Sequence, residues 1–189
     1  MAKSSLHIAK HIVLLIILFS GIIMPCRGEA QTRELLLKAG YVEKFTHFVD
    51  WSKNPNSKDS LFKVAVIGDK KFSMALEQIF SKIKVNEKSV KVTYITSVDQ
   101  IKDNLILVIS KSISNEKLDE ILNYTTGKTI LTISEKDGYG VRGSIINLIV
   151  VDEFIRYEIN RITLGKSGLK MNSLLIKSGT LVGKVDSND

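Results

Sequence analysis

Three short and almost wholly apolar runs constrain the fold of this chain more than any other feature of its sequence. They are Phe62–Ile67 (FKVAVI), Leu105–Ile109 (LILVI) and Ile130–Ile133 (ILTI). Runs of this kind are typical of strands that are buried on both faces, as in a parallel sheet. Amphipathic helical patterns lie between them, at Ser73–Ile83 and Asn115–Tyr124. This alternation predicts a mainly parallel sheet with helices on its faces.

The flanking segments extend this pattern and end it with a hairpin. An amphipathic helix is predicted over about Arg33–Trp51, with Leu37 on its apolar face. Ile145–Val151 and Phe154–Ile159 read as two strands with only Asp and Glu between them, which predicts an antiparallel pair. The other expected elements are an edge-type strand around Val92 and helices near Asn160–Lys166 and Ser173–Ser178. We therefore expect a three-layer α/β sandwich whose mainly parallel sheet carries a C-terminal antiparallel hairpin.

The first thirty residues predict a cleaved secretory signal peptide. Two lysines precede an uncharged run of thirteen residues, Ile12–Met24, whereas a bilayer span needs roughly 20. Gly28-Glu29-Ala30 then offers a small-x-small cleavage site, which would leave residues 31–189 as one exported domain. An uncleaved anchor and lipidation of Cys26 are the alternatives.

Export would leave the chain few of the residues that common active sites use. Cys26 would be lost with the signal segment, and His47 would be the one remaining histidine. On the predicted helix its neighbours are Glu43 and Asp50, a row that could hold a metal or form weak ion pairs on a solvated face. Zinc sites usually take three or four protein ligands, and nucleophilic catalysis needs a base beside the nucleophile. We expect no catalytic residue, no metal and no cofactor.

The chain is basic, but its charge is not concentrated. The net charge is +7, from 27 Lys and Arg against 20 Asp and Glu, and loss of the first thirty residues would lower it to +5. The lysines are spread along the chain rather than clustered with aromatic residues, which argues against nucleic-acid binding. A scattered positive charge is compatible with weak, peripheral attraction to an anionic membrane surface or cell-wall polymer.

Polar residues follow three of the predicted strands and suggest a small-ligand cleft. Gly68 and Asp69 end the first strand, while Ser110 and Ser134 end two others. Open α/β sheets bind ligands beyond the carboxyl ends of their strands. No G-x-G-x-x-G or G-x-x-x-x-G-K-[ST] pattern is present, so these phosphate-binding loops are excluded. The alternative is that these residues only begin turns and cap helices.

The loop Gly138–Gly143 (GYGVRG) is the most distinctive local feature of the sequence. Its Tyr139 and Arg142 could form an exposed aromatic–guanidinium pair, and both residue types anchor protein interfaces. The alternative is a turn that needs glycine at positive φ. With Trp51, at the end of the first predicted helix, these two residues are the candidate partner-binding residues.

Several ordered motifs resemble the YfiR family. Lys38–Trp51 (KAGYVEKFTHFVDW) is similar to the family's opening pattern of K-A-x-Y, K-F and F-x-x-W. Ser144–Leu148 (SIINL) resembles its G-x-I-N-F strand, and Arg156–Asn160 (RYEIN) resembles its R-F-E-I-N strand. Gly168–Ser173 (GLKMNS) is similar to its G-L-K-I-S-S segment. The resemblance extends from about Leu35 to Val182.

The resemblance implies a small periplasmic regulator that is not an enzyme. It would bind the periplasmic part of an inner-membrane sensor, a diguanylate cyclase or a histidine kinase, and repress it. With a cyclase as partner, it would lower cyclic di-GMP and biofilm formation. Ser52 and Leu148 depart from the family pattern, which has Pro and Phe there. A soluble small-ligand receptor is the alternative function, and a homodimer is compatible with either.

Overall fold

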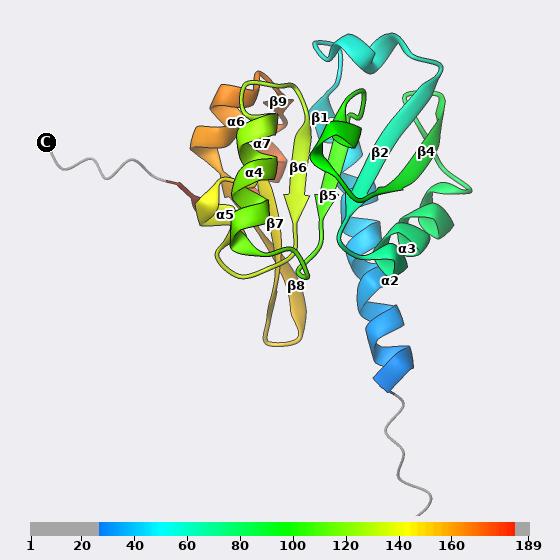
Figure 1. Ribbon diagram of the computed structural model, residues 1–189, viewed down its shortest axis with the longest axis vertical. Helices are drawn as coiled ribbons and strands as arrows, with labels where there is room; N and C mark the ends of the chain where they lie inside the picture. The colour runs from blue at the N-terminus through cyan, green and yellow to red at the C-terminus, as the bar shows by residue number, and fades with distance from the viewer. Residues whose placement is uncertain (1–26, 184–189) are drawn as a thin grey trace, which may run out of the picture. The chain divides into compact units, whose positions relative to one another are not determined.

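The computed structural model describes residues 27–183, and a sheet of eight strands forms its centre (Figure 1). The predicted signal segment as far as Cys26 lies outside the described residues. The strands are β2 (Leu61–Ile67), β3 (Lys84–Val85), β4 (Lys88–Ile95), β5 (Ile106–Ile109), β6 (Leu131–Ser134), β7 (Ile146–Val151), β8 (Phe154–Asn160) and β10 (Thr180–Val182).

Five of these strands form a parallel core within the sheet. The full strand order is β10-β8-β7-β6-β5-β2-β4-β3. The strands β4, β2, β5, β6 and β7 are mutually parallel, in the order 2-1-3-4-5 that is common in doubly wound α/β domains. β8 pairs antiparallel with β7, and β10 adds to β8 in parallel. The predicted fold class, with its C-terminal antiparallel hairpin, is therefore confirmed.

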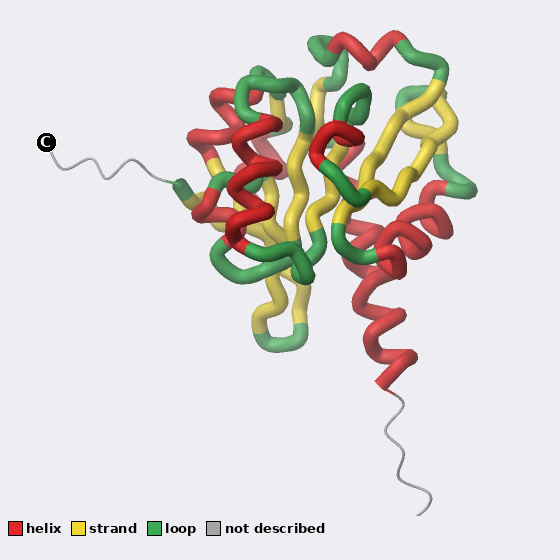
Figure 2. The backbone as a smooth tube through the Cα atoms, viewed as in Figure 1, coloured by secondary structure: helices red, strands yellow, loops and turns green. Residues whose placement is uncertain are grey.

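Helices cover both faces of this sheet, as the red and yellow segments of Figure 2 show. The α-helices are α2 (Arg27–Thr46), α3 (Lys70–Phe80), α4 (Asn115–Thr125), α5 (Tyr139–Arg142), α6 (Arg161–Ser167) and α7 (Ser173–Ser178), and the 3-10 helices are η1 (Pro55–Lys58) and η2 (Val98–Ile101). Alternate residues of β2 point to opposite layers. Val64 and Val66 belong to one core with residues of α2 and α3, whereas Ala65 and Ile67 belong to a second core with residues of α4. Burial on both faces explains why the strand sequence is apolar without alternation.

The first helix ends earlier than the sequence pattern predicts. It stops at Thr46 instead of continuing to Trp51, because the chain becomes extended to form β1 (Val49–Asp50). This short strand pairs antiparallel with β9 (Lys170–Met171), in a second sheet of two strands. The indole Nε1 of Trp51 donates to the Thr46 carbonyl at 2.9 Å and thereby ties the residue after β1 to the end of α2.

The buried face of α2 is also rotated from the predicted one. Leu37, expected on the apolar face, is 53% exposed, while Leu35, Ala39 and Val42 are buried. Phe45, further along the same helix, is also buried. The spacing of apolar residues predicted the wrong face because the face that meets the sheet includes a lysine, Lys38. A search for apolar residues does not count a lysine.

The hairpin of β7 and β8 depends on a two-residue turn in the left-handed region. Asp152 and Glu153 have φ values of 49° and 66°. Two consecutive residues with positive φ make the type of turn that matches the twist of a hairpin, and they favour Asn-Gly or Asp-Gly. In this left-handed conformation the Cβ of Glu153 lies too close to the backbone, which costs free energy, and glycine has no Cβ.

We predict that Glu153→Gly raises the free energy of unfolding by roughly 0.5–1 kcal/mol, because it removes this penalty. Urea titration would measure the change. Glu120→Gly, within α4, is the matched control and should lower stability by about 1 kcal/mol, since glycine is a poor helix former. A loss of stability in Glu153→Gly would contradict the prediction.

Candidate functional site

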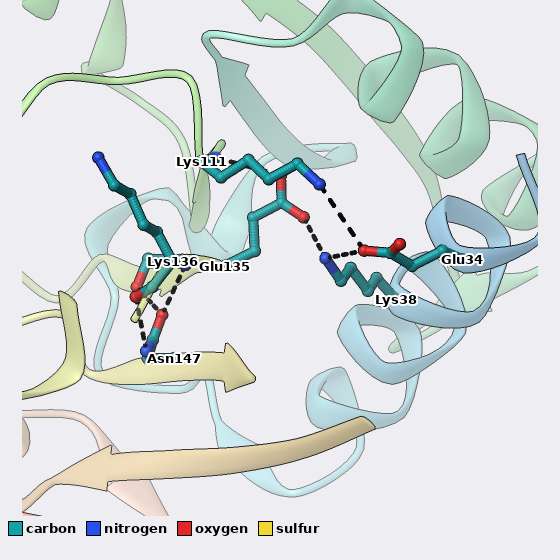
Figure 3. Close-up of polar contacts among 7 residues, drawn as sticks. Glu34, Lys38, Lys111, Glu135, Lys136 and Asn147 are labelled. Atoms are coloured by element: carbon teal, nitrogen blue, oxygen red, sulfur yellow. Dashed lines mark hydrogen bonds and ion pairs between the residues drawn. The ribbon is translucent and has the colours of Figure 1, made fainter. Parts of the chain in front are cut away.

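A buried ion pair joins α2 to the end of β6. The Lys38 Nζ lies 2.7 Å from Oε2 of Glu135, and the two side chains are only 3% and 1% exposed. The same ammonium lies 2.6 Å from Oε1 of Glu34, one helical turn earlier (Figure 3). Lysine and glutamate are almost never fully buried unless they are paired. This cluster is therefore the most unusual polar feature in the described part of the chain.

The second oxygen of Glu135 extends the cluster to a neighbouring strand. Glu135 Oε1 accepts a hydrogen bond from the backbone N–H of Lys111 at 3.2 Å. The Lys111 side chain in turn lies 3.9 Å from Glu34. Because Lys111 follows β5 and Glu135 follows β6, the cluster lies at the carboxyl ends of the parallel strands, where α/β domains usually place their functional residues.

Pairing keeps Lys38 and Glu34 charged. Burial alone would lower the pKa of Lys38, but its hydrogen bonds to Glu135 and Glu34 outweigh burial and raise that pKa above its ordinary value. The hydrogen bond from Lys38 lowers the pKa of Glu34, with the positive charges of Lys38 and Lys111 adding to the effect against partial burial. The stabilisation from Lys38 is thus present at neutral pH and is lost as pH rises through its raised pKa. The stabilisation from Glu34 is also present at neutral pH, and it is lost as the pH falls through the lowered pKa of Glu34.

A buried asparagine lies beside this cluster and connects three strands. Asn147 Oδ1 accepts from Ser134 Oγ at 2.8 Å and from the Lys136 backbone N–H at 3.3 Å. Its Nδ2 donates to the Lys136 carbonyl at 3.0 Å and to Glu158 at 2.8 Å. Asn147 and Lys136 are drawn together in Figure 3. The amide is fully buried and uses both its donors and its acceptor. It therefore fixes the chain after β6 against β7 and β8.

The structure brings the predicted ligand-cleft residues to one edge, but mostly in local roles. The Gly68 carbonyl accepts from Ser112 Oγ at 3.0 Å, and Asp69 caps α3 by accepting from the Lys71 N–H at 2.7 Å. Ser134 is bonded to Asn147, as described above. A Cβ on Gly68 would lie within 3 Å of Ser112 and Ile113, so side chains already fill the space beside that turn.

Ser110 differs from the other three cleft candidates. Ser110 is fully buried. Among the described residues, its Oγ is the one buried side-chain polar atom without a hydrogen-bond partner. Ser110 follows β5, and β5 lies next to β2 in the sheet. The chain goes from β2 to β4 on one side and then returns to β5 on the other side, so the strand order changes direction between β2 and β5.

Two of the three predicted partner-binding residues are buried. Tyr139 is fully buried, and its hydroxyl donates to the Ile113 carbonyl, so the expected exposed pair with Arg142 is wrong. Tyr139 starts α5 directly after left-handed Gly138, and this turn directs its ring into the core shared with α4. Trp51 is 3% exposed and packs edge-on against Phe62.

Arg142 remains at the surface. Its Nη2 lies 2.6 Å from Oδ2 of Asp119 on α4, and its side chain is 38% exposed. It is the one residue of the three that can contact another molecule without rearrangement.

His47 forms only part of its expected carboxylate row. Its Nε2 lies 2.6 Å from Glu43, and the histidine side chain is 55% exposed. Asp50 belongs to β1 instead of the helix, and its carboxylate accepts from the Ser52 N–H. Within residues 27–183, no group of three or more His, Cys, Asp and Glu side chains is placed to hold a metal ion. The same part of the chain contains no helix with the length and apolarity that a membrane crossing requires.

The sequence interpretation missed Lys38, Glu135 and Asn147. A signal for Lys38 was present, because it lies on the same helical face as Leu35 and Val42 and follows Glu34 by one turn. A charge inside an apolar stripe indicates a buried partner, although not which one. Nothing in the sequence identifies Glu135 as that partner, 97 residues away.

The fold and the polar cluster together define a small three-layer α/β domain whose strand ends are closed by paired charges. A family model described as YfiR/HmsC-like matches residues 36–180, and the chain belongs to this family. The resemblance seen in the sequence motifs is therefore confirmed. A comparison with curated proteins gave no match.

We predict that Lys38→Met lowers the free energy of unfolding by about 3–5 kcal/mol, because it leaves the buried Glu135 without a counter-charge. Lys38→Met combined with Glu135→Gln should recover much of this loss, since no buried charge remains. Urea titration at neutral pH would measure both. Lys117→Met, which breaks an exposed pair with Glu120, is the control and should cost less than about 1 kcal/mol. Strictly additive losses in the double variant would show that Lys38 and Glu135 do not interact.

Proposed function

We propose that this chain is an exported regulator that binds the periplasmic part of an inner-membrane signalling sensor and holds it inactive. The observation that carries this proposal is the family match over residues 36–180. A diguanylate cyclase is the proposed sensor, so the regulator would lower cyclic di-GMP and restrain biofilm formation. It would act by binding, not by catalysis.

The physical requirement on such a regulator is differential affinity. It must bind the inactive conformation of the sensor more tightly than the active one, because a ligand with equal affinity for both shifts no population. A shift from almost fully active to almost fully inactive needs ~5.5 kcal/mol of difference. A rigid binding surface serves this purpose, and the bonded strand ends around Lys38 and Asn147 support such rigidity.

Two surface features support a binding role. Arg142 presents a partly exposed guanidinium on α5. The end of the β7–β8 hairpin, which extends beyond the neighbouring strands in Figure 1, exposes three apolar residues: Val150 (52%), Val151 (44%) and Phe154 (65%). Adjacent exposed apolar residues are typical of interaction sites. Tyr139 and Trp51, which are buried, would contribute by holding the surfaces around them.

The alternative is a periplasmic receptor with a ligand at the carboxyl ends of the strands. One observation favours it, because the unpartnered Ser110 hydroxyl lies at that edge, beside Gly68 and Asp69. A small molecule retained by the purified protein in native mass spectrometry would support this alternative.

Crosslinking in intact cells tests the regulatory proposal directly. A tagged copy at native expression should capture one inner-membrane sensor, and deletion of the gene should raise cyclic di-GMP several-fold. Capture of a histidine kinase would keep the regulatory role but change the pathway. The proposal fails if no membrane protein is captured and cyclic di-GMP does not change.

We predict that export removes residues 1–30 by cleavage after Ala30. The intact mass of protein purified from the periplasm should correspond to a chain that begins at Gln31. Cleavage there would shorten α2 by its first turn and would leave Glu34 and Lys38 in place. A lipid-modified mass beginning at Cys26 would contradict this prediction.

We predict that Arg142→Ala and Phe154→Ser each weaken sensor binding at least about fivefold, since residues at the centre of an interface often contribute 1 kcal/mol or more. Both side chains are substantially exposed, so the melting temperature should change little. Two exposed residues elsewhere serve as matched controls: Arg161→Ala on α6 and Leu174→Ser on α7. Binding would be measured by biolayer interferometry with the sensor's periplasmic domain. Equal weakening by the controls would show that neither surface is specific.

A further inference from the structure

A groove opens at the amino-terminal edge of the sheet, on the opposite edge from Lys38 and Glu135. Its lining comes from three segments that each precede a parallel strand: Lys53–Asn56 before β2, Lys102–Asp103 before β5, and Gly127–Ile130 before β6. Tyr124, at the end of α4, completes it. The groove has a volume of about 460 Å³, which lies within the range of small-molecule binding sites.

The groove concentrates positive charge in a chain whose lysines are otherwise spread out. Lys53, Lys102 and Lys128 line it, and the one acidic lining residue is Asp103. Within residues 27–183, none of these three ammonium groups has a carboxylate within ion-pair distance, a property that they share with most lysines of the described chain. Three cations against one carboxylate leave an excess of positive charge on this concave surface, and such an excess raises the local concentration of anions.

The groove also has an apolar wall. The Lys128 Nζ lies 3.1 Å from the centre of the Tyr124 ring, so the aromatic ring and the cation are presented together. Pro55 and the mostly buried Ile130 contribute further apolar surface. An apolar wall beside a few charged groups is the usual composition of a site for a small organic ligand.

We propose that this groove binds a small organic anion, with a phosphate or carboxylate group held by the lysines and an apolar ring against Tyr124 and Ile130. Lysine suits this role because its ammonium is a compact point charge that accepts anions from many directions, unlike the planar fork of arginine. Neither Arg142 nor the exposed apolar residues of the β7–β8 hairpin line this groove. It would allow a soluble periplasmic anion to be sensed by the same domain.

Phenyl phosphate is a suitable probe because it carries both features. In titrations of the ¹⁵N-labelled mature protein at low salt, it should cause saturable shifts at the backbone amides of residues 127–130 and 102–103. Inorganic phosphate, which lacks the ring, and phenol, which lacks the charge, should each bind at least about fivefold more weakly, since each loses contacts worth about 1 kcal/mol.

Charge-neutralising variants test the placement of the ligand. Lys102→Gln and Lys128→Gln should each weaken phenyl phosphate binding about three- to fivefold, as expected for loss of one exposed charge contact. Lys91→Gln, on the exposed surface of β4, removes the same charge outside the groove and should have no effect. The lysines in the groove are exposed, and an unchanged spectrum of each free variant would establish that it folds.

Three results would overturn the proposal: no saturation by phenyl phosphate, equal weakening by Lys91→Gln, or equal affinity for inorganic phosphate. Each is independent of sensor capture, so a failure here leaves the proposed regulatory function standing.

Discussion

The contact between Lys38 and Glu135 is the constraint on which the arrangement of this domain most depends. An ammonium that is 3% exposed must find a counter-charge, because an isolated buried ion costs several kcal/mol. Glu135 can supply it only if the turn of α2 that carries Lys38 lies beside the carboxyl ends of β5 and β6. The pair therefore fixes both the rotation of the helix and its position along the strands. Apolar packing alone specifies such positions less sharply, since volume-conserving rearrangements of a core are tolerated.

Around this pair, polar groups replace the open rim that many α/β sheets keep at their strand ends. Asn147 ties the segment after β6 to β7 and β8, and Asp69 and Ser112 close the turn after β2. The edge is charged but almost entirely bonded, and among the described residues the Ser110 hydroxyl is the one buried side-chain polar group without a hydrogen-bond partner. A concave surface with an excess of positive charge lies instead at the amino-terminal edge, where Lys53, Lys102 and Lys128 line one groove with Asp103. The two edges of one sheet thus differ in chemistry: one is closed by bonded polar groups, and the other carries an open groove lined by lysines.

Much of the fold could be predicted because local patterns and tertiary structure agree. The apolar runs became the central strands within a residue or two, and the helix at Ser173–Ser178 was placed correctly. The errors occur where a distant segment overrides a local pattern. Residues 49–50 continue a helical pattern, yet they pair with residues 170–171 as a strand. Strand β10 was missed because its three residues carry too little pattern and depend on β8 for their hydrogen bonds. Tyr139 was expected at the surface because the glycines around it suggested an exposed loop, but α5 turns it into the core.

The sequence by itself determined the layered α/β architecture, the hairpin and the membership of the YfiR/HmsC-like family, because periodicity and ordered motifs are local properties that one chain displays directly. Only the tertiary structure decided which charges are buried and paired, which loop residues reach the surface, and which lysines share a groove. These properties depend on residues far apart in the chain, such as Lys38 and Glu135 or Lys53 and Lys128. Their meeting depends on strand order, which no local pattern specifies.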